Sequence, residues 1–205
     1  MSSAGPRERL GILGGTFDPP HAGHLYAAAA SREALDLDRV LFVVANDPWQ
    51  KSGVRGVTPA ADRLAMVEAA IEGVASFEVS AIELDRGGPS FTVETVEALA
   101  AAARDQGLPS PEQFVVVGAD VVGTLWSWHR AHDLAELVTV AVVSRPGTRI
   151  EASPGFRIEV VTGAGVDVSS SEIRSLVKEG RPIDGLVPEA VERCIRARGL
   201  YAVSR

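Results

Sequence analysis

Hydrophobic and polar positions along the chain alternate between two periods, one typical of covered strands and one typical of helices. Short apolar runs predict strands at 10–13, 39–45, 77–84, 113–117, 137–143 and 156–161. Longer segments predict helices at 24–35, 58–72, 92–105, 171–178 and 189–198. Thr58 is the expected cap of the second helix, with Pro59 at its first position. Strands and helices alternating at this spacing favour right-handed crossovers and a largely parallel sheet.

The end of the chain departs from this alternation, because two helices follow each other there across a link rich in glycine and proline. The sequence contains no internal repeat and no interdomain linker. We therefore expect one domain over residues 1–205, with a core of about 8–165 and a helical part of about 166–205. Ligands of such sheets bind beyond the carboxyl ends of the strands, so the loops after the first, second, fourth and fifth strands are the places to examine.

Composition narrows the class of protein. The 205 residues are 46% hydrophobic and 23% charged, as in globular proteins, and the one cysteine, Cys194, excludes a disulfide framework within the chain. The net charge of −7 argues against broad binding of nucleic acid or an anionic membrane, although not against a local anion site. The N-terminus has no signal-peptide core and no apolar run is long enough to span a bilayer, so we expect a cytoplasmic protein.

The loop after the first strand carries the strongest chemical signal. From Gly14 to His24 it reads Gly-Gly-Thr-Phe-Asp-Pro-Pro-His-Ala-Gly-His. Glycines permit close approach of the backbone to a phosphate, and the following helix presents its N-terminal amides, which together make an anion site. His21 and His24 are three residues apart, so we expect both rings on one helix face, able to donate hydrogen bonds to phosphate oxygens. We interpret Asp18 as a turn-forming residue that orients the loop, not as a base.

Other phosphate and metal motifs do not fit this loop. No G-x-G-x-x-G follows the strand, no Gly-Lys-Ser/Thr completes a P-loop, and no H-E-x-x-H or third ligand indicates zinc. A second cluster, Val168 to Arg174, combines hydroxyls, a helix N-terminus and an arginine one turn later. It has the chemistry of a second phosphate clamp. The alternative interpretation of this cluster is a purely structural one, in which the serines cap the helix and the arginine is solvated.

With these two motifs the sequence resembles the HxGH nucleotidyltransferases, which transfer a nucleotidyl group from a nucleoside triphosphate. The resemblance implies an α/β Rossmann-like nucleotidyltransferase fold, with a mostly parallel sheet, helices on both faces and a small C-terminal helical segment. It implies that the ATP phosphates are bound by Gly14, Gly15, Thr16, His21, His24, Ser171 and Arg174. Among these, the candidate catalytic residues are Thr16, His21, His24 and Arg174.

Three further stretches are similar to the bacterial nicotinate-nucleotide adenylyltransferases within that family. They are Gly118-Ala119-Asp120 followed by Leu125 and Trp128, the segment 90–95 (SFTVET), and the segment 47–52 (DPWQKS). The second departs from the family pattern by having phenylalanine for tyrosine and glutamate for aspartate. Those enzymes join ATP and nicotinate mononucleotide to give nicotinate adenine dinucleotide and pyrophosphate.

The resemblance gives these stretches roles in binding the two substrates. Gly118 and Asp120 would hold the adenosine of ATP. The nicotinate mononucleotide would be bound by Trp128 stacking on the pyridine ring, the Thr92 backbone at the carboxylate, and Lys51 and Arg145 near the phosphate. Each has a structural alternative: a core aromatic for Trp128, a helix cap for Asp120, and a solvated loop or turn residue for Lys51 and Arg145. The segment 46–49 departs from the simpler family form, and its contacts stay unassigned.

The chemistry expected is direct in-line attack by a phosphate oxygen of the mononucleotide on the α-phosphorus, with no covalent intermediate. A phosphate monoester is already largely a dianion at neutral pH, so no general base is required and the protein supplies positioning and charge neutralisation. Mg²⁺ would be held mainly by the ATP phosphates. Three alternatives stay open: phosphopantetheine as the acceptor, nicotinamide mononucleotide as the acceptor, and a non-catalytic nucleotide-binding module. A homo-oligomer is compatible with the sequence.

Overall fold

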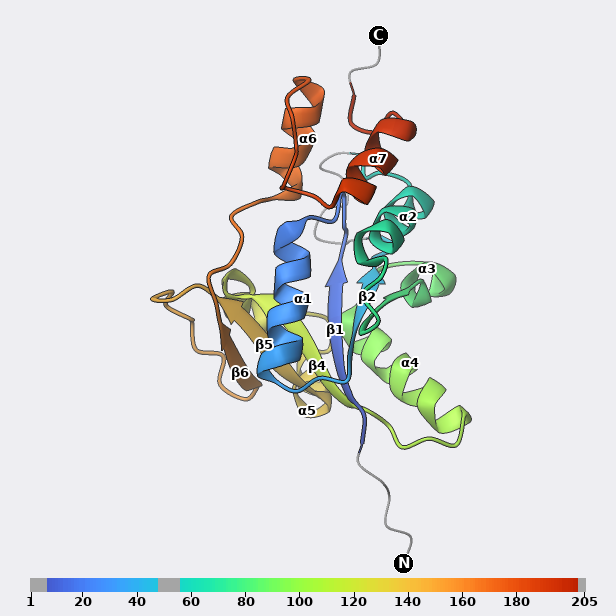
Figure 1. The fold of residues 1–205 in the computed structure, drawn as a ribbon. Coiled ribbons are helices and arrows are strands. Elements are labelled where there is room, and N and C mark those ends of the chain that lie inside the picture. The colour runs from blue at the N-terminus through green and yellow to red at the C-terminus, as the bar shows by residue number, and fades with distance from the viewer. Residues whose placement is uncertain (1–6, 48–55, 203–205) are drawn as a thin grey trace, which may run out of the picture. The chain divides into compact units, whose positions relative to one another are not determined.

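The computed structural model describes residues 7–47 and 56–202. Within these residues the strands form one sheet in the order β3-β2-β1-β4-β5-β6 (Figure 1). The pairs β1–β4, β4–β5 and β5–β6 are parallel, which confirms the expected α/β class. The bounds are β1 (Arg9–Gly15), β2 (Arg39–Val44), β3 (Phe77–Ser80), β4 (Glu112–Gly118), β5 (Val138–Ser144) and β6 (Arg157–Thr162).

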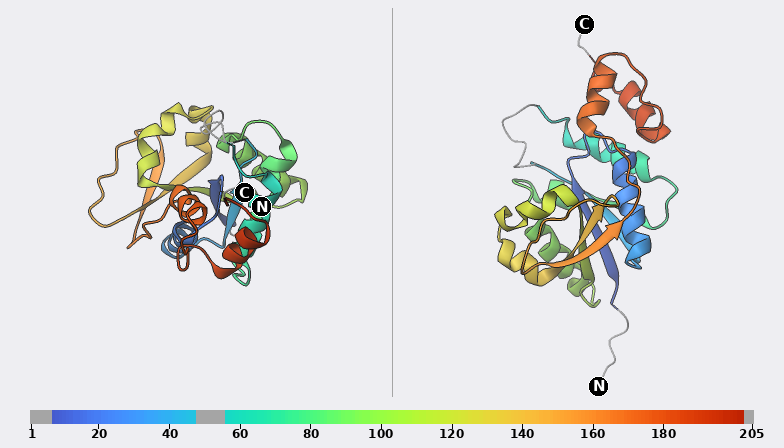
Figure 2. Two further views of the ribbon diagram at one scale, coloured as in Figure 1. Left: turned by 90° about the horizontal axis from the view of Figure 1, so that it is seen from above. Right: turned by 90° about the vertical axis from the view of Figure 1, so that its left-hand side faces the viewer.

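Helices connect the strands and follow the last of them. The bounds are α1 (Ala22–Ala34), α2 (Ala60–Ile71), α3 (Ile82–Arg86), α4 (Thr92–Asp105), the 3₁₀ segment η1 (Ala119–Ser127), α5 (Ala131–Leu137), α6 (Ser170–Lys178) and α7 (Glu189–Ala197). Helix α1 lies on one side of β4 and β5, and η1 and α5 lie on the other (Figure 2). Among the described helices, none is both long and apolar enough to cross a membrane.

Two differences between the structure and the sequence pattern have a clear physical reason. The strand expected over 77–84 ends at Ser80, whose Oγ accepts a hydrogen bond from the N–H of Ile82 and so begins α3. The apolar run was compatible with either element, since periodicity cannot separate short strands from short helices. Thr58 does not cap α2 either: Pro59 is the N-cap, and no side chain caps that end.

The chain forms two compact units, and β1, α1 and β2 each have residues in both of them. The first comprises Met1–Gly14, Ala27–Leu41 and Phe91–Gly165, and the second comprises Gly15–Tyr26, Phe42–Ser90 and Val166–Arg205. The described part of the first unit has its core along the central strands, in Leu10, Ile12, Val115, Val140 and Val142. The core of the second unit contains Phe17, Phe42, Met66, Ile173 and Val191. The loop with the two histidines and the C-terminal helices therefore belong to the same unit.

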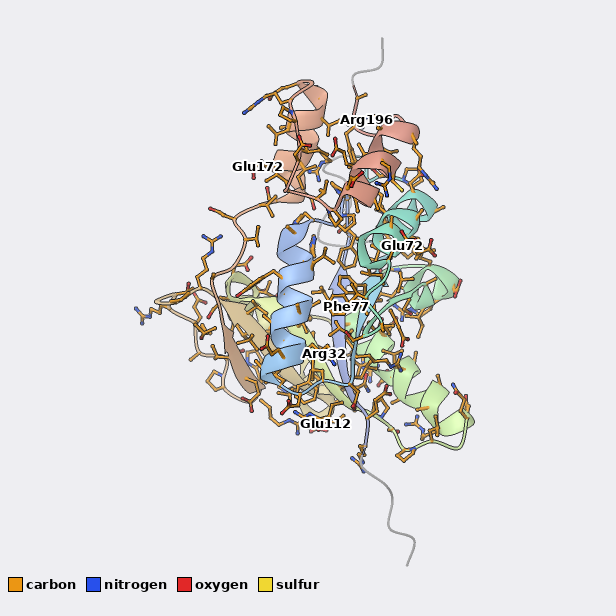
Figure 3. The ribbon with its side chains drawn as sticks, in the orientation of Figure 1. Arg32, Glu72, Phe77, Glu112, Glu172 and Arg196 are labelled. Atoms are coloured by element: carbon orange, nitrogen blue, oxygen red, sulfur yellow. The ribbon has the colours of Figure 1, made fainter. Side chains whose placement is uncertain are left out.

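In the second unit α7 packs beside α2 (Figure 1). Val191 and Ile195 of α7 are buried. Arg198 forms an ion pair with Asp62 of α2. On β3, the ring of Phe77 (labelled in Figure 3) lies 5.4 Å from that of Phe42 between centroids. The C-terminal segment is therefore fastened to this unit by apolar and ionic contacts.

Candidate active site

The strand order reverses between β1 and β4, which are neighbouring parallel strands. Open α/β sheets bind ligands outside the carboxyl ends of their strands at such a switch point. Strand β1 ends in the pair Gly14-Gly15, and β4 ends at Gly118. Three predicted ATP-binding glycines thus lie at the carboxyl ends of the two strands that flank the switch point.

His21 and His24 lie side by side at the start of α1. Their ring centroids are 3.8 Å apart and the planes are inclined by 31°, which confirms the expectation of one shared face. The backbone N–H of His21 donates to Nδ1 of His24 at 3.2 Å. Because Nδ1 is the acceptor, the neutral ring of His24 carries its proton on Nε2. The structure therefore makes His24 a hydrogen-bond donor through Nε2.

His21 is the buried member of the pair. Its Nδ1 has no hydrogen-bond partner among the described residues, and burial lowers the pKa of His21 to about 4. The ring is therefore neutral at pH 7. A Cβ added to Gly23 would lie 3.1 Å from Cε1 and Nδ1 of His21, which explains why glycine stands between the two histidines. A buried polar nitrogen without a partner is costly, so this atom is suited to meet a ligand.

The buried His21 predicts a pH dependence of stability. An unfolded histidine has a pKa of about 6.5, whereas the pKa in the folded chain is about 4. Between these values the unfolded state binds the additional proton, so the free energy of unfolding falls as pH falls through this window. Denaturant titrations should show the wild type losing up to about 1.4 kcal/mol more per pH unit than His21→Asn. Parallel profiles for the two proteins would contradict a neutral, buried His21.

The second cluster, Val168 to Arg174, begins α6 and contacts the loop that contains the histidines. Ser169 caps the helix by accepting from the N–H of Glu172 at 3.2 Å, and Glu172 is labelled in Figure 3. Ser170 Oγ donates to the carbonyl of Pro19 at 2.8 Å. The capping alternative is thus correct for Ser169, although the next serine binds the loop that contains the histidines.

Arg174 joins the same loop one turn later. Its Nη1 donates to the carbonyl of Asp18 at 2.6 Å, and its Nη2 donates to Ser171 Oγ at 2.9 Å. Arg174 is half-buried, so the alternative of a solvated arginine is wrong. Of the predicted phosphate-binding residues, the structure therefore brings the His21–His24 loop, Ser171 and Arg174 together within the second unit.

Arg63 of α2 is a site residue that the sequence analysis missed. It is 2% exposed. Its Nη1 donates to the carbonyls of Thr16 (2.9 Å) and Ala45 (2.7 Å), and its Nε donates to that of Thr58 (2.8 Å). The one signal in the sequence is an arginine three residues before Met66 on the buried face of α2. Arg63 therefore ties Thr16, a candidate catalytic residue, to the end of β2.

The adenosine candidates lie at the end of β4. A Cβ added to Gly118 would lie 2.5 Å from Oδ1 of Asp120, so the Asp120 carboxylate rests against the glycine. Asp120 is exposed, and η1 has no side-chain capping bond. The helix-cap alternative for Asp120 is therefore wrong.

The pyridine candidates lie together in the first unit. Thr92 begins α4, Trp128 follows η1, and their chain neighbours Phe91 and His129 stack with centroids 4.2 Å apart and planes inclined by 26°. Trp128 is half-buried, so it is not part of the buried core. Its indole Nε1 is buried and has no partner among the described residues. His129 was not among the predicted site residues, and its contact with Phe91 joins the two segments.

The remaining candidates follow β5 and β2. Arg145 is exposed, and a Cβ on Gly165 would lie 3.2 Å from its Cγ, so the side chain runs along that glycine. Lys51 lies outside the described residues. Of the segment 46–49, Asn46 donates from its backbone to Ser90 Oγ at 2.8 Å and from Nδ2 to the carbonyl of Gly88 at 2.9 Å. Asn46 thus holds the loop after β2 to the segment that precedes α4.

The strand order and the loops at the switch point define a Rossmann-like nucleotide-binding protein. The family model described as "Cytidylyltransferase-like" matches residues 12–176, so the chain belongs to this family.

The chain has close relatives over nearly its full length. It is 38% identical over 200 residues to a "Probable nicotinate-nucleotide adenylyltransferase" of Acidothermus cellulolyticus, covering 96% of each chain. It is 42% identical over 203 residues to a protein of the same name from Gemmatimonas aurantiaca, covering 94% of this chain and 92% of that one. Among solved structures, the nicotinic acid mononucleotide adenylyltransferase of Plasmodium falciparum complexed with NaAD has a TM-score of 0.75 at 15% identity, covering 95% of this chain and 97% of that chain, and shares the fold.

Proposed function

We propose that this protein transfers AMP from ATP to nicotinate mononucleotide, giving nicotinate adenine dinucleotide and pyrophosphate. The observation that carries the proposal is the His21–His24 ring pair. The loop that contains this pair accepts a hydrogen bond from Arg174 of the second cluster, Val168 to Arg174. The names of the relatives, at 38% to 42% identity, support the choice of acceptor.

The proposed reaction is one displacement at the α-phosphorus. A phosphate oxygen of the mononucleotide forms the new O–P bond, the bond between the α-phosphorus and its bridging oxygen breaks, and pyrophosphate leaves. Negative charge increases on the leaving group, and donors already held in place stabilise it without reorganisation. The Nε2–H of His24 is such a donor, since the His21 N–H fixes the ring through Nδ1. The Arg174 guanidinium adds positive charge beside the same loop.

The donor set fits Mg²⁺ that arrives with ATP. The phosphate-binding candidates supply imidazole, hydroxyl and guanidinium groups, whereas Mg²⁺ prefers carboxylate, phosphate and water oxygens. Within residues 7–47 and 56–202, no three His, Cys, Asp or Glu side chains form a group that could hold a metal. The ion would be held by the phosphates and would neutralise their charge. The residues of this chain would bind and orient the triphosphate.

Pyrophosphate release tests the proposal. The protein is mixed with ATP and Mg²⁺, and nicotinate mononucleotide, nicotinamide mononucleotide and phosphopantetheine are offered separately. We expect strong preference for nicotinate mononucleotide. Preference for nicotinamide mononucleotide would support adenylyl transfer but contradict a carboxylate contact at Thr92. Reaction with phosphopantetheine alone would contradict the proposed acceptor. Folded protein that binds ATP and is silent with all three would be a nucleotide-binding module.

Trp128 provides a test of the acceptor site. If the indole stacks on the pyridine ring, Trp128→Ala should raise the KM for nicotinate mononucleotide by about tenfold or more, the scale for loss of one aromatic stack on a base. The KM for ATP should change little. Trp128→Phe keeps an aromatic face and should recover most of the acceptor affinity. Steady-state kinetics with each substrate varied in turn measures both constants, and equal losses for the two substrates would remove Trp128 from the pyridine site.

A further inference from the structure

The C-terminal segment reaches the loop of the two histidines through Tyr201. Its hydroxyl donates to Oδ1 of Asp18 at 2.8 Å, across 183 positions of sequence. The Thr58 side chain hydrogen bonds to the same phenol, and Sδ of Met66 lies 3.8 Å from it. Tyr201 has a φ of +64°, a left-handed conformation that is uncommon for bulky residues. The surrounding contacts must therefore stabilise this placement of the ring.

Asp18 is the buried centre of the loop. It is 2% exposed. Besides the phenol on Oδ1, its Oδ2 lies 3.5 Å from the N–H of Thr58, and its carbonyl accepts from Arg174. A buried carboxylate that loses a donor keeps the cost of desolvation without the compensating hydrogen bond. The phenol makes a short hydrogen bond to this carboxylate, at 2.8 Å, so its removal would weaken the hold on Asp18.

The backbone between Asp18 and the two histidines is stiff, so the position of Asp18 determines the position of the histidines. Between Asp18 and His21 stand only Pro19 and Pro20, whose rings fix φ and remove most of the freedom of that backbone. His21 then binds Nδ1 of His24 through its backbone N–H. A displacement of the Asp18 carboxylate would therefore move both rings and not be absorbed in the loop.

We propose that Tyr201 is a positioning residue for adenylyl transfer, which acts through Asp18 to set the place of the His21–His24 ring pair. Within the part of the chain that the structure describes, the phenol hydrogen bonds to Asp18 and Thr58, neither of which is a candidate substrate-binding residue. The proposal rests on the proposed function for its kinetic consequence. The structural part, a phenol that holds the loop in place, can be measured without substrate.

The kinetic test is Tyr201→Phe, which removes the hydroxyl and keeps the ring. We expect kcat for adenylyl transfer to fall about tenfold, the effect of a modest loss of transition-state positioning. The KM for nicotinate mononucleotide should stay unchanged, because the candidates for binding its pyridine ring, Thr92 and Trp128, belong to the first unit. The matched control is Tyr26→Phe, the one other tyrosine of the chain, which should keep the wild-type kcat. A Tyr201→Phe variant as active as this control would overturn the proposal.

Hydrogen exchange on the free protein tests the structural part. The amides of His24 and Leu25 both donate to the carbonyl of His21, so they report on the order of the loop. They should exchange about tenfold faster in Tyr201→Phe, while the amide of Val191, which donates within the turn that begins α7, should keep its rate. Faster exchange at all three amides would mean that Tyr201 merely stabilises the unit, and would overturn the positioning role. If the wild type transfers no AMP, the proposed function fails, but this exchange experiment still decides whether Tyr201 orders the loop.

Discussion

Replacement of His24 by alanine is expected to reduce kcat for adenylyl transfer by at least about 100-fold and to leave the fold intact, the scale for removal of one preorganised donor to a developing negative charge. Contacts within the protein hold this ring before any substrate arrives. Its Nδ1 accepts from the His21 N–H, and the ring packs edge-to-face with Phe17, the centroids being 5.0 Å apart. The Nε2–H therefore needs no reorientation when charge develops on the leaving pyrophosphate.

Two substitutions at His24 separate the donor from the local contact. In His24→Asn the side-chain oxygen can still accept from the His21 N–H, although the donor at the Nε2 position is lost. In His24→Gln a side-chain N–H can reach that position. We expect the asparagine variant to be as slow as alanine and the glutamine variant to be faster than both. His132→Ala, at an exposed position of α5, is the control for loss of an imidazole. Pre-steady-state measurement of AMP transfer reads out the chemical step, and near-normal turnover in folded His24→Ala would refute the assigned role.

The order of strands and helices could be predicted because it depends on local periodicity. Helix α4 has the expected bounds, Thr92 to Asp105, and the other expected helices are present with ends shifted by a few residues. The segment between β4 and β5 was harder. It contains η1 and α5, which are separated by Arg130 in the left-handed conformation and neither of which is a long amphipathic helix. Short 3₁₀ segments depend on tertiary contacts more than on a repeating pattern.

In the candidate site too, features set by local spacing could be predicted from the sequence, whereas features set by distant contacts could not. Spacing alone predicts that His21 and His24 share a helix face, and the rings do lie together. Burial of His21 and its lowered pKa depend on what packs over the ring, which no local pattern contains. The hydrogen bond from Tyr201 to Asp18 joins positions that are 183 residues apart. Arg63 was missed because its carbonyl partners come from separate segments, so its burial makes sense only in the folded chain.

Arg63→Met is expected to lower the free energy of unfolding by about 3 to 5 kcal/mol. Methionine fills most of the space of the arginine stem but donates no hydrogen bond. The carbonyls of Thr16, Ala45 and Thr58 would then lose the guanidinium that now binds them at 2.7 to 2.9 Å. Buried acceptors left without a donor cost about 1 to 3 kcal/mol each. The positive charge near the buried Asp18 would be lost as well.

Urea denaturation measures this change, with Arg32→Met as the matched control. Arg32 is exposed in the last turn of α1 (labelled in Figure 3), so its substitution should alter the free energy of unfolding by no more than about 0.5 kcal/mol. Arg63→Lys should fall between the two, because an ammonium keeps the charge but lacks the planar fork that reaches several carbonyls at once. Since one of those carbonyls belongs to Thr16, kcat should fall in Arg63→Lys even where the protein stays folded. An Arg63→Met variant as stable as Arg32→Met would show that the loop after β1 is held without the buried guanidinium.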